Sequence, residues 1–395
     1  MVALGPYLEA TPLPRVLQVQ RLEGPEAFAF LAREWDELEA QLTPRTPFAG
    51  ALWNELWWKH YPSERLMVHD DLFLHVVRER GRLVAVAPMM LTRRPSVGPV
   101  KTSVLQCFGA DVNVTEIRGL VCRPEDQGPA LGALMAHFAR SDATWDWIDW
   151  GGVRDDGSGH EELAAAGVIT GRQTPTYYLP LAPSWAEFRG RLSRNIKESL
   201  RKCYNSLKRD GHGFTLRVVE SPAESAAALQ VFFRLHRQRA RSNAKIKHSD
   251  VFAKPKDRAF LTEYVQRMAE RGQVRIFQLE VGSGVVATRL GFQLGDELYL
   301  YYSGYEMAWG RYSVMTTLLA EAIKWAIDRR LRLVGLSTGR DVSKLRWGPQ
   351  SVVFRSALQV TPGWQSALAF RAYHQMLQAR DDDSALARLL TLARR

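Results

Sequence analysis

The sequence predicts two similar α/β domains in tandem, because the same succession of elements occurs in it twice. Residues 72–92 and 274–294 each read as a strand, a Gly-centred turn and a second strand, and Val84 aligns with Val286. The two hairpins therefore lie 202 residues apart. A period this long exceeds the roughly 20–45 residues of a solenoid unit and indicates duplicated domains instead.

The elements that follow each hairpin repeat as well. In the first copy a helix at 130–140 precedes an apolar strand at 147–150. In the second copy a helix at 314–329 precedes a strand at 331–337. Both strands end in a Gly-containing turn. A chain of 395 residues is long enough for two such domains, each with its own core.

Three segments are expected: a first domain at 1–172, a second domain at 173–362 and a helical tail at 363–395. The first boundary rests on a stretch rich in Gly and acidic residues at 151–173. Asp381–Asp383 is expected to divide the tail into two short helices. The other elements expected in the second domain are helices at 184–210, 222–240 and 258–271 and strands at 177–181, 274–281, 285–293, 297–305 and 351–360.

The composition is that of an ordinary globular protein, with 46% hydrophobic and 24% charged residues. No stretch approaches the ~20 apolar residues that span a bilayer, and the first residues lack the pattern of a signal peptide. Cys107, Cys122 and Cys203 show no metal-ligand spacing, so free thiols in a reducing cytoplasm and no bound metal are expected.

The formal net charge of +11 predicts attraction to polyanions. Candidates are nucleic acid, acyl carrier protein, the phosphates of coenzyme A and an anionic polysaccharide; a basic surface kept for solubility is the plain alternative. One strongly basic helix begins with Ser184 as N-cap and Glu187 as its capping-box partner. Its cations Arg194, Lys197 and Arg201 share one side, which either docks a phosphate-bearing donor or is a solvated face.

The second half, read as helix, helix, antiparallel strands, loop, helix and strand, resembles the GNAT acyltransferase superfamily. Over about residues 25–360 the chain looks like the two-domain GNAT-like family first described beside bacterial cellulose-biosynthesis genes. The resemblance rests on the Trp/Phe cluster before GRLVAVAPMML, on LSRNIKESLRKCYNSLKR, and on YLYYSGYEMAWGRYSVMTTLLAEAI followed by Gly339-Arg340-Asp341 and Lys344-Leu345-Arg346-Trp347. It implies tandem GNAT-like domains, each with a mixed, mostly antiparallel sheet flanked by helices, and an acyl-CoA or acyl carrier protein thioester as co-substrate.

The resemblance also implies a phosphate site where a long helix begins. Backbone N–H groups at a helix start, together with the helix dipole, attract anions. Gly310 would let the backbone approach a phosphate, and Arg311 would add a charged hydrogen bond. The alternative is a plain β–α turn that contains a Gly. The expected cofactor-binding residues are Trp309, Gly310, Arg311, Ser313, Val314 and Lys344, with Arg194, Lys197 and Arg201 of the basic helix.

Acyl transfer to an amine needs a base, a polarised carbonyl and an acid for the leaving thiolate. Backbone N–H groups on a splayed strand would polarise the carbonyl. Among the tyrosines on or beside the strand at 297–305, Tyr302 and Tyr312 are the preferred acids, although either could be an interface aromatic. Period-two alternation places Tyr302 on the face opposite Tyr299 and Tyr301.

Three residues are candidates for the base. Glu306 and Asp341 lie at strand ends, where ligands gather, but a carboxylate there can equally be a helix cap or an ion-pair partner. His236 has a suitable intrinsic pKa, yet it falls on the apolar side of its helix, where a histidine is more often structural.

The leading functional prediction is an N-acyltransferase that moves an acyl group from a thioester to an amine or hydroxyl of a small-molecule, peptide or saccharide acceptor. One alternative resembles the Fem-type transferases, which pair GNAT-like domains but take an aminoacyl group from tRNA. The other is a non-enzymatic scaffold that binds an anionic polymer. The first domain, whose counterpart of the phosphate loop is acidic at Glu125 and Asp126, is expected to be a degenerate copy that shapes the acceptor site.

Overall fold

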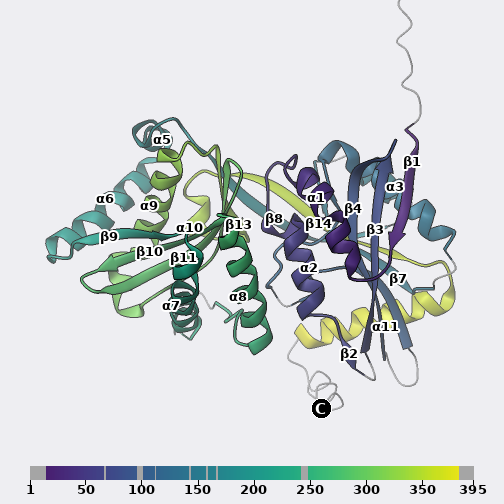
Figure 1. Cartoon of the computed structure of the whole chain (residues 1–395). Helices are drawn as coiled ribbons and strands as arrows, with labels where there is room; N and C mark the ends of the chain where they lie inside the picture. The colour runs from purple at the N-terminus through teal and green to yellow at the C-terminus, as the bar shows by residue number, and fades with distance from the viewer. Residues whose placement is uncertain are drawn as a thin grey trace, which may run out of the picture.

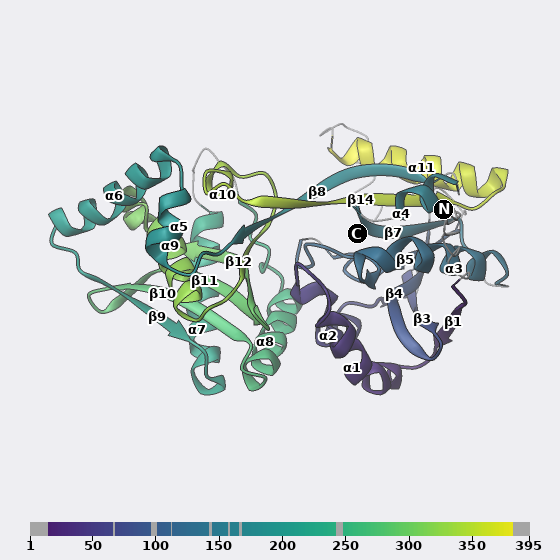
Figure 2. The same ribbon diagram turned by 90° about the horizontal axis from the view of Figure 1, so that it is seen from above.

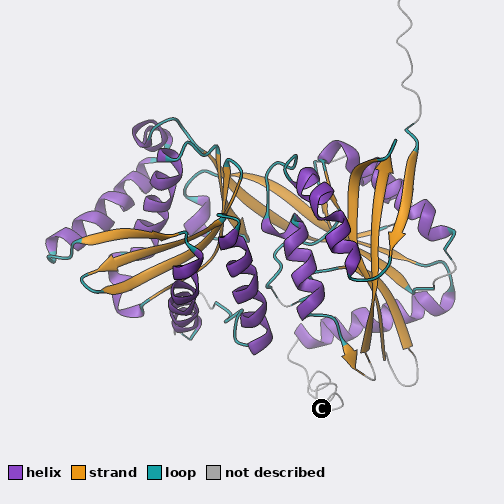
Figure 3. Cartoon of the chain, in the orientation of Figure 1, coloured by secondary structure: helices purple, strands orange, loops and turns teal. Residues whose placement is uncertain are grey.

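The protein is a tandem α/β structure whose two halves are joined by one continuous sheet (Figures 1 and 3). The computed structural model describes residues 15–65, 68–95, 101–111, 113–141, 144–156, 159–165, 168–241 and 248–381. Within these residues the sheet has 14 strands, most of them antiparallel. The tandem fold class predicted from the repeat is confirmed.

The strand order is nearly symmetric about its middle. It runs β1-β3-β4-β5-β7-β14-β8-β13-β12-β11-β10-β9 in the described residues, with β2 beside β3 and β6 beside β4. In the first half the strands are β1 (Leu17–Leu22), β2 (Glu64–Arg65), β3 (Val68–Glu79), β4 (Arg82–Pro95), β5 (Lys101–Cys107), β6 (Val121–Cys122) and β7 (Trp147–Arg154). The others are β8 (Ile169–Pro180), β9 (Phe214–Val219), β10 (Val274–Val281), β11 (Gly284–Leu294), β12 (Glu297–Tyr305), β13 (Leu333–Thr338) and β14 (Gln350–Val360).

The repeated hairpins of the sequence correspond to β3–β4 and β10–β11. Val77 pairs with Ala85 in the first hairpin, and Leu279 pairs with Ala287 in the second. Each hairpin is followed by a parallel pair, β5 with β7 and β12 with β13. The two halves therefore repeat both the order and the direction of their strands.

The halves exchange their last strands. β8 follows β7 in the chain but pairs with β13 of the second half, whereas β14 follows β13 but pairs with β7 of the first half. β8 and β14 also pair with each other, and Figure 2 shows them running side by side from one half to the other. This exchange makes the backbone hydrogen bonds of each half depend on a strand that comes from the other half.

Helices cover both faces of the sheet. In the first half α3 and α4 pack on one face, and their apolar residues form a core with Ile148 and Trp150 of β7. In the second half α6 and α9 cover the corresponding core, which includes Leu298 and Leu300 of β12. The helices are α1 (Glu26–Glu39), α2 (Ala51–His60), α3 (Gln127–Ala139), α4 (Gly159–Ala165), α5 (Trp185–Arg191), α6 (Arg194–Arg209), α7 (Pro222–Ala240), α8 (Pro255–Glu270), α9 (Val314–Asp328), α10 (Val342–Leu345) and α11 (Trp364–Asp381), with the 3-10 helices η1 (Pro47–Ala49), η2 (Pro124–Asp126) and η3 (Met307–Tyr312).

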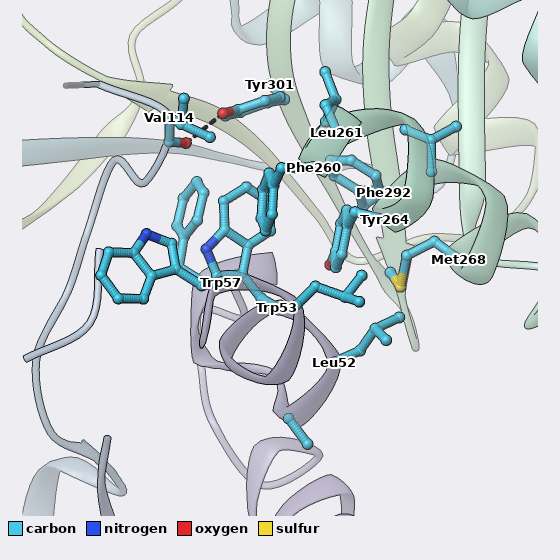
Figure 4. Packing of buried hydrophobic residues seen from close by; sticks show 14 of the residues in the cluster. Leu52, Trp53, Trp57, Val114, Phe260, Leu261, Tyr264, Met268, Phe292 and Tyr301 are labelled. Carbon is cyan, nitrogen blue, oxygen red and sulfur yellow. Dashed lines mark hydrogen bonds between the residues drawn. The ribbon is translucent and has the colours of Figure 1, made fainter. Parts of the chain in front are cut away.

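A single hydrophobic core joins the two halves through α2 and α8 (Figure 4). Trp53 of α2 is 1% exposed, and its ring centroid lies 4.9 Å from that of Phe260 and 4.7 Å from that of Tyr264, both on α8. Trp53, Phe260 and Tyr264 therefore belong to the core that joins the halves. A buried aromatic contact of this size resists separation of the halves.

Most of the predicted elements are confirmed within a few residues, and one helix is different. The helix expected at 184–210 is two helices, α5 and α6, with Leu192 in an extended conformation between them. The break arises because Ser193 acts as a second N-cap and accepts a hydrogen bond from the backbone N–H of Ile196. The predicted cap at Ser184 is confirmed, since its hydroxyl accepts from the N–H of Glu187.

The tail begins as predicted with a helix, α11, which packs on the first half. Its Tyr373 stacks on Trp147 of β7, with ring centroids 5.2 Å apart. The second helix expected in the tail lies outside the described residues. No helix in the described part of the chain is long and apolar enough to cross a membrane.

Candidate functional site

The parallel strands β12 and β13 separate soon after they begin. They pair at Glu297–Tyr299 with Leu333–Gly335, and no pairing follows beyond Tyr299 in the described strands. On its other side β12 carries an irregularity, because Arg289 pairs with Ser303 whereas Gly291 pairs with Leu300. Three steps along β12 thus match two along β11, which is a β-bulge at Tyr301–Tyr302. The gap and the bulge thus interrupt the regular pairing of β12 on both of its sides.

The bulge corrects the predicted orientation of Tyr302. Alternation placed this side chain on the face opposite Tyr301, but both rings pack on the core shared with α7 and α8, with centroids 4.4 Å apart. An extra residue in a strand shifts every later side chain to the other face. The periodicity of the sequence gave no sign of this insertion.

A pocket of about 410 Å³ opens where α9 begins. Ser313, which precedes α9, has a left-handed backbone (φ 53°) and makes no side-chain cap, and the first turn of α9 holds no acidic residue. Uncapped N–H groups at a helix start favour an anion. The lining residues are Arg239, His248, Arg289, Tyr305, Gly310, Ser313, Val314, Met315, Thr316, Leu319, Asp341, Ser343 and Arg346.

Three arginines from three elements converge on this pocket. Arg239 of α7 donates to the hydroxyl of Ser303 at 3.0 Å and to Nε2 of His248 at 2.8 Å. Arg346 donates to the hydroxyl of Thr316 on α9 at 2.6 Å. Arg289 of β11 keeps a buried Nε without a hydrogen-bond partner in the described structure. Against these cations the pocket lining holds one carboxylate, Asp341.

The electrostatics of the pocket show that it has an excess of positive charge. Burial and the nearby charge of Arg239 lower the pKa of Arg289 to about 10, so the guanidinium is still cationic at neutral pH. Burial also lowers the pKa of Arg239. Because burial disfavours the charged form of an arginine, an anionic ligand beside these buried side chains stabilises them. The described lining therefore carries more positive than negative charge, which favours an anion over a cation.

A carboxylate from the first half lies at the other side of the β12–β13 gap. Glu116 accepts hydrogen bonds from the hydroxyls of Tyr299 and Ser337, both at 2.5 Å. Burial raises the pKa of Glu116, although these two hydrogen bonds and the charge of Lys344 oppose the rise. Ser337, at the end of β13, has a left-handed backbone with φ 68°. A partly buried carboxylate with a raised pKa is a common form of general base.

Tyr302 and Tyr312, the two tyrosines predicted to protonate the leaving thiolate, donate hydrogen bonds to groups that do not line the anion pocket. The hydroxyl of Tyr302 donates to the carbonyl of Asn113 at 2.7 Å. The hydroxyl of Tyr312 donates to Asp210 at 2.9 Å and accepts from Arg311 at 2.8 Å. Among the tyrosines considered from the sequence, Tyr305 lines the anion pocket.

The three candidate bases occupy different surroundings. Asp341 lines the pocket and caps α10 by accepting from the N–H of Ser343 at 2.8 Å. Burial alone would raise the pKa of Asp341, but the hydrogen bonds from Ser343 and the charge of Lys344 outweigh it, so the pKa lies below its usual range. Glu306 follows β12, where its N–H donates to the carbonyl of Val286 at 2.9 Å.

His236 is held in the core beneath the bulge. Its Nδ1 lies 3.1 Å from the carbonyl oxygen of Ser303, and its ring stacks on Phe232. Burial lowers the pKa of His236. The neighbouring Gly304 allows this close packing, because a Cβ there would lie 2.3 Å from the backbone N of His236.

The predicted cofactor-binding residues fall into two groups. Gly310, Ser313 and Val314 line the anion pocket. The other six lie apart from its lining: Trp309 and Arg311 pack against Tyr312, Lys344 donates to the carbonyl of Thr338, Lys197 donates to the carbonyl of Gly190, Arg201 pairs with Glu198, and Arg194 begins α6 as an exposed residue.

Sequence reasoning did not select Glu116, Arg239, Arg289 or Arg346. A signal did exist for Arg289, because it is a charged residue within the otherwise apolar strand VVATRLGF. Arg346 stood within one of the motifs that carried the family resemblance. Glu116 had no local signal, since its partner Tyr299 is 183 residues away. No group of three or more His, Cys, Asp or Glu side chains that could hold a metal ion is found among the described residues.

Comparison with known proteins finds a family model that matches part of the second half. Residues 194–345, which include the bulge, α9 and all of the anion-pocket lining except Arg346, match the family model described as "Acetyltransferase (GNAT) domain". A search of curated proteins finds no match. The second half of the chain therefore contains a segment similar to a GNAT acetyltransferase domain.

Several solved structures are similar to the chain. The chain is similar to the crystal structure of FemX, with a TM-score of 0.54 and 13% identity over 82% of this chain and 95% of that one. Lower TM-scores relate it to the C-terminal domain of a putative lysylphosphatidylglycerol synthetase from Agrobacterium fabrum (0.49, 13% identity, 88% and 96% covered). A tandem GNAT protein of the clavulanic acid pathway is also similar (0.45, 12% identity, 88% and 100% covered).

Proposed function

We propose that the protein transfers an acyl group from a phosphate-bearing thioester, acyl-CoA or acyl carrier protein, to an amine. The observation that carries this proposal is the three-arginine pocket at the uncapped start of α9, next to the gap between β12 and β13. A phosphate of the donor would bind the α9 N–H groups and Arg289. The chain of the donor would then lead its thioester along β12 toward Glu116.

In this proposal each residue has a separate role in the reaction. Backbone N–H groups of β12 near the bulge polarise the thioester carbonyl. Glu116 takes a proton from the attacking amine, and the new C–N bond forms as the C–S bond breaks. Tyr305 donates a proton to the departing thiolate. Because Glu116 lies on the first-half side of the gap, the acceptor approaches from that half.

A second donor is supported by a different observation. The Fem-type alternative takes an aminoacyl group from tRNA, and the fold similarity to FemX extends over both halves of the chain. The exposed basic helix α6 lies against α9 and η3, and its Ser199 accepts from Arg346 at 3.4 Å. A polyanion bound along α6 would reach the pocket. The ester of an aminoacyl-tRNA would meet the same polarising groups.

The donor is identified by binding and turnover measured side by side. Purified protein is titrated calorimetrically with acetyl-CoA, a long-chain acyl-CoA and bulk tRNA at several salt concentrations, and thiol release is followed with a panel of amines. Saturable thioester binding with thiol release supports the thioester donor. Tight, salt-dependent binding of tRNA without thioester turnover favours the aminoacyl-tRNA donor. Polymer binding without any transfer would contradict both and leave a binding scaffold.

A further inference from the structure

We propose that a second pocket, in the first half, binds the acceptor and that this acceptor is a linear amine ending in a carboxylate. The inference rests on the proposed transfer function and names the substrate class for it. The pocket has a volume of about 530 Å³ and is lined by β4, β5, β7, β8, β14, the loop at 109–118 and α11. Arg94, Glu116 and His374 are among its lining residues.

The pocket occupies the position in the first half that corresponds to the β12–β13 gap in the second half. Its floor is the parallel pair β5–β7, which is the counterpart of β12–β13 in the second half. β5 and β7 pair through Gln106 with Asp149, and no pairing continues past these residues in the described strands. The first half therefore keeps an opening between two parallel strands, the feature that forms the donor gap in the second half.

The first half has nevertheless lost the means to hold a phosphate at its helix start. Asp126, which precedes α3, is 2% exposed and carries its own cations, Arg15 and Arg123, at 2.8 and 2.7 Å. A carboxylate near a helix start interacts with the helix dipole as an external anion would, although the side chain of Asp126 makes no capping hydrogen bond to α3 in the described structure. The donor is accordingly expected in the second half, and the opening in the first half is available for the acceptor.

One end of this pocket reaches the reacting centre. Glu116 lines the pocket and also bonds Tyr299 and Ser337 at the β12–β13 gap. The neighbouring loop residues Asn113 and Val114 accept hydrogen bonds from the hydroxyls of Tyr302 and Tyr301. An amine at this end would thus face Glu116 and the thioester carbonyl at once.

Some of the charged side chains that line the pocket bind other groups of the protein, whereas two arginines lack a carboxylate partner among the described residues. Arg118 pairs with Asp149 at 2.6 Å, and Asp111 accepts from the N–H groups of its own loop. Arg94 and Arg172 have no carboxylate partner among the described residues, and the buried Nε of Arg94 has no hydrogen bond there. A guanidinium with open donors binds a carboxylate through two parallel hydrogen bonds.

The far end of the pocket is fixed by α11. The guanidinium of Arg94 lies 4.3 Å from the ring centroid of Tyr373, and His374 joins the lining. Arg94 pairs with Thr102 on β5, while Arg118 and its partner Asp149 lie beside Gln106. Four residues of strand separate these positions, which is about 13 Å. An extended chain of about four residues spans that length.

Tetraglycine and tetraglycinamide test the proposal, because they differ only in the terminal carboxylate. Calorimetric titration of the wild-type protein should show at least about tenfold tighter binding of tetraglycine, since a charge-assisted bidentate contact contributes that much. Arg94→Gln should abolish the difference, and Arg94→Lys should restore part of it. Arg93→Gln is the matched control, because Arg93 pairs with Asp71 outside the pocket.

Equal binding of the two peptides to wild type, no binding of either, or an unchanged preference in Arg94→Gln would each overturn the carboxylate-ended acceptor. Donor affinity is measured in the same variants and should be unchanged in Arg94→Gln. If the wild-type protein does not bind the donor, the proposed function is contradicted. The peptide titrations would still show whether the first-half pocket binds a carboxylate-ended acceptor. Melting temperatures of all variants show whether each has folded.

Discussion

The hydroxyl of Tyr299, on β12 of the second half, donates a hydrogen bond of 2.5 Å to the carboxylate of Glu116 in the first half. Ser337 at the end of β13 donates to the other oxygen of the same carboxylate. Both strands that form the donor gap thus bond one acidic residue of the partner domain. Neither half alone holds the complete arrangement.

Glu116→Gln should lower kcat by about 100-fold or more while KM for the donor changes little. The amide keeps the size of the side chain but cannot accept a proton, and a positioned general base contributes roughly 10²–10⁴-fold. Steady-state thiol release with a saturating amine measures the effect. Asp341→Asn is the comparison, because Asp341 lines the donor pocket and a lowered pKa makes it a weaker base. A larger loss in Asp341→Asn would assign the base to that residue.

The same substitution should change how stability depends on pH. Because burial raises the pKa of Glu116, the folded state holds this proton more tightly than the unfolded chain. Its contribution is full below the unfolded pKa of about 4.3 and declines as pH rises toward the folded pKa. Glu116→Gln should therefore gain stability relative to wild type as pH increases from about 4 to 7, measured by urea unfolding. Lys344 is the nearby charge that limits the gain.

Glu263→Gln provides a control of opposite sign. Burial alone would raise the pKa of Glu263, but contacts with Lys59 and His60 outweigh it and lower the pKa. Its contribution to stability is present above the unfolded pKa and lost as pH falls through the folded pKa. This variant should lose stability relative to wild type as pH rises. The same trend in both variants would contradict the role of burial at Glu116.

Tyr305→Phe should slow transfer from an alkyl thioester by at least about tenfold and leave transfer from an aryl thioester nearly unchanged. The reason is that an alkyl thiolate needs a proton as it leaves, whereas an aryl thiolate is a better leaving group. Tyr302→Phe and Tyr312→Phe are assayed with the same donor pair, because both were preferred from the sequence. If only Tyr302→Phe or only Tyr312→Phe slows transfer from the alkyl thioester more than transfer from the aryl thioester, that residue is the acid.

Trp53→Ala should reduce the free energy of unfolding by about 3–5 kcal/mol, because it empties a fully buried site between α2 and α8. The shared core and exchanged strands further predict that both halves of the wild-type protein unfold in one transition. Differential scanning calorimetry measures both effects. Two separate transitions in the wild type would show that the halves are independent. Trp364→Ala, at a site 74% exposed, is the matched control and should cost little.

Local pattern was sufficient to predict most of the elements. The strands at 274–281 and 297–305 and the cap at Ser184 agree with the structure, because each depends on residues close in the chain. The repeat was visible for the same reason. Two similar hairpins remain similar in sequence whether or not they touch.

The features that build the site depend on distant residues. The exchange of β8 and β14 is a choice of partner, and strand periodicity says nothing about partners. The bulge at Tyr301–Tyr302 inserts one residue into a pattern that otherwise alternates correctly. Glu116 looks like an ordinary loop acid until the second half folds against it.

Arg289→Met tests whether the pocket at the start of α9 binds the phosphate of the donor. The buried Nε of Arg289 has no hydrogen-bond partner in the described structure, so removing the charge of this side chain should leave the melting temperature unchanged or raise it. Calorimetric titration with the donor should show a Kd increased about 10- to 100-fold, with Arg33→Gln on the exposed face of α1 as control. A Kd equal to that of the wild type, in a folded Arg289→Met protein, would contradict the account.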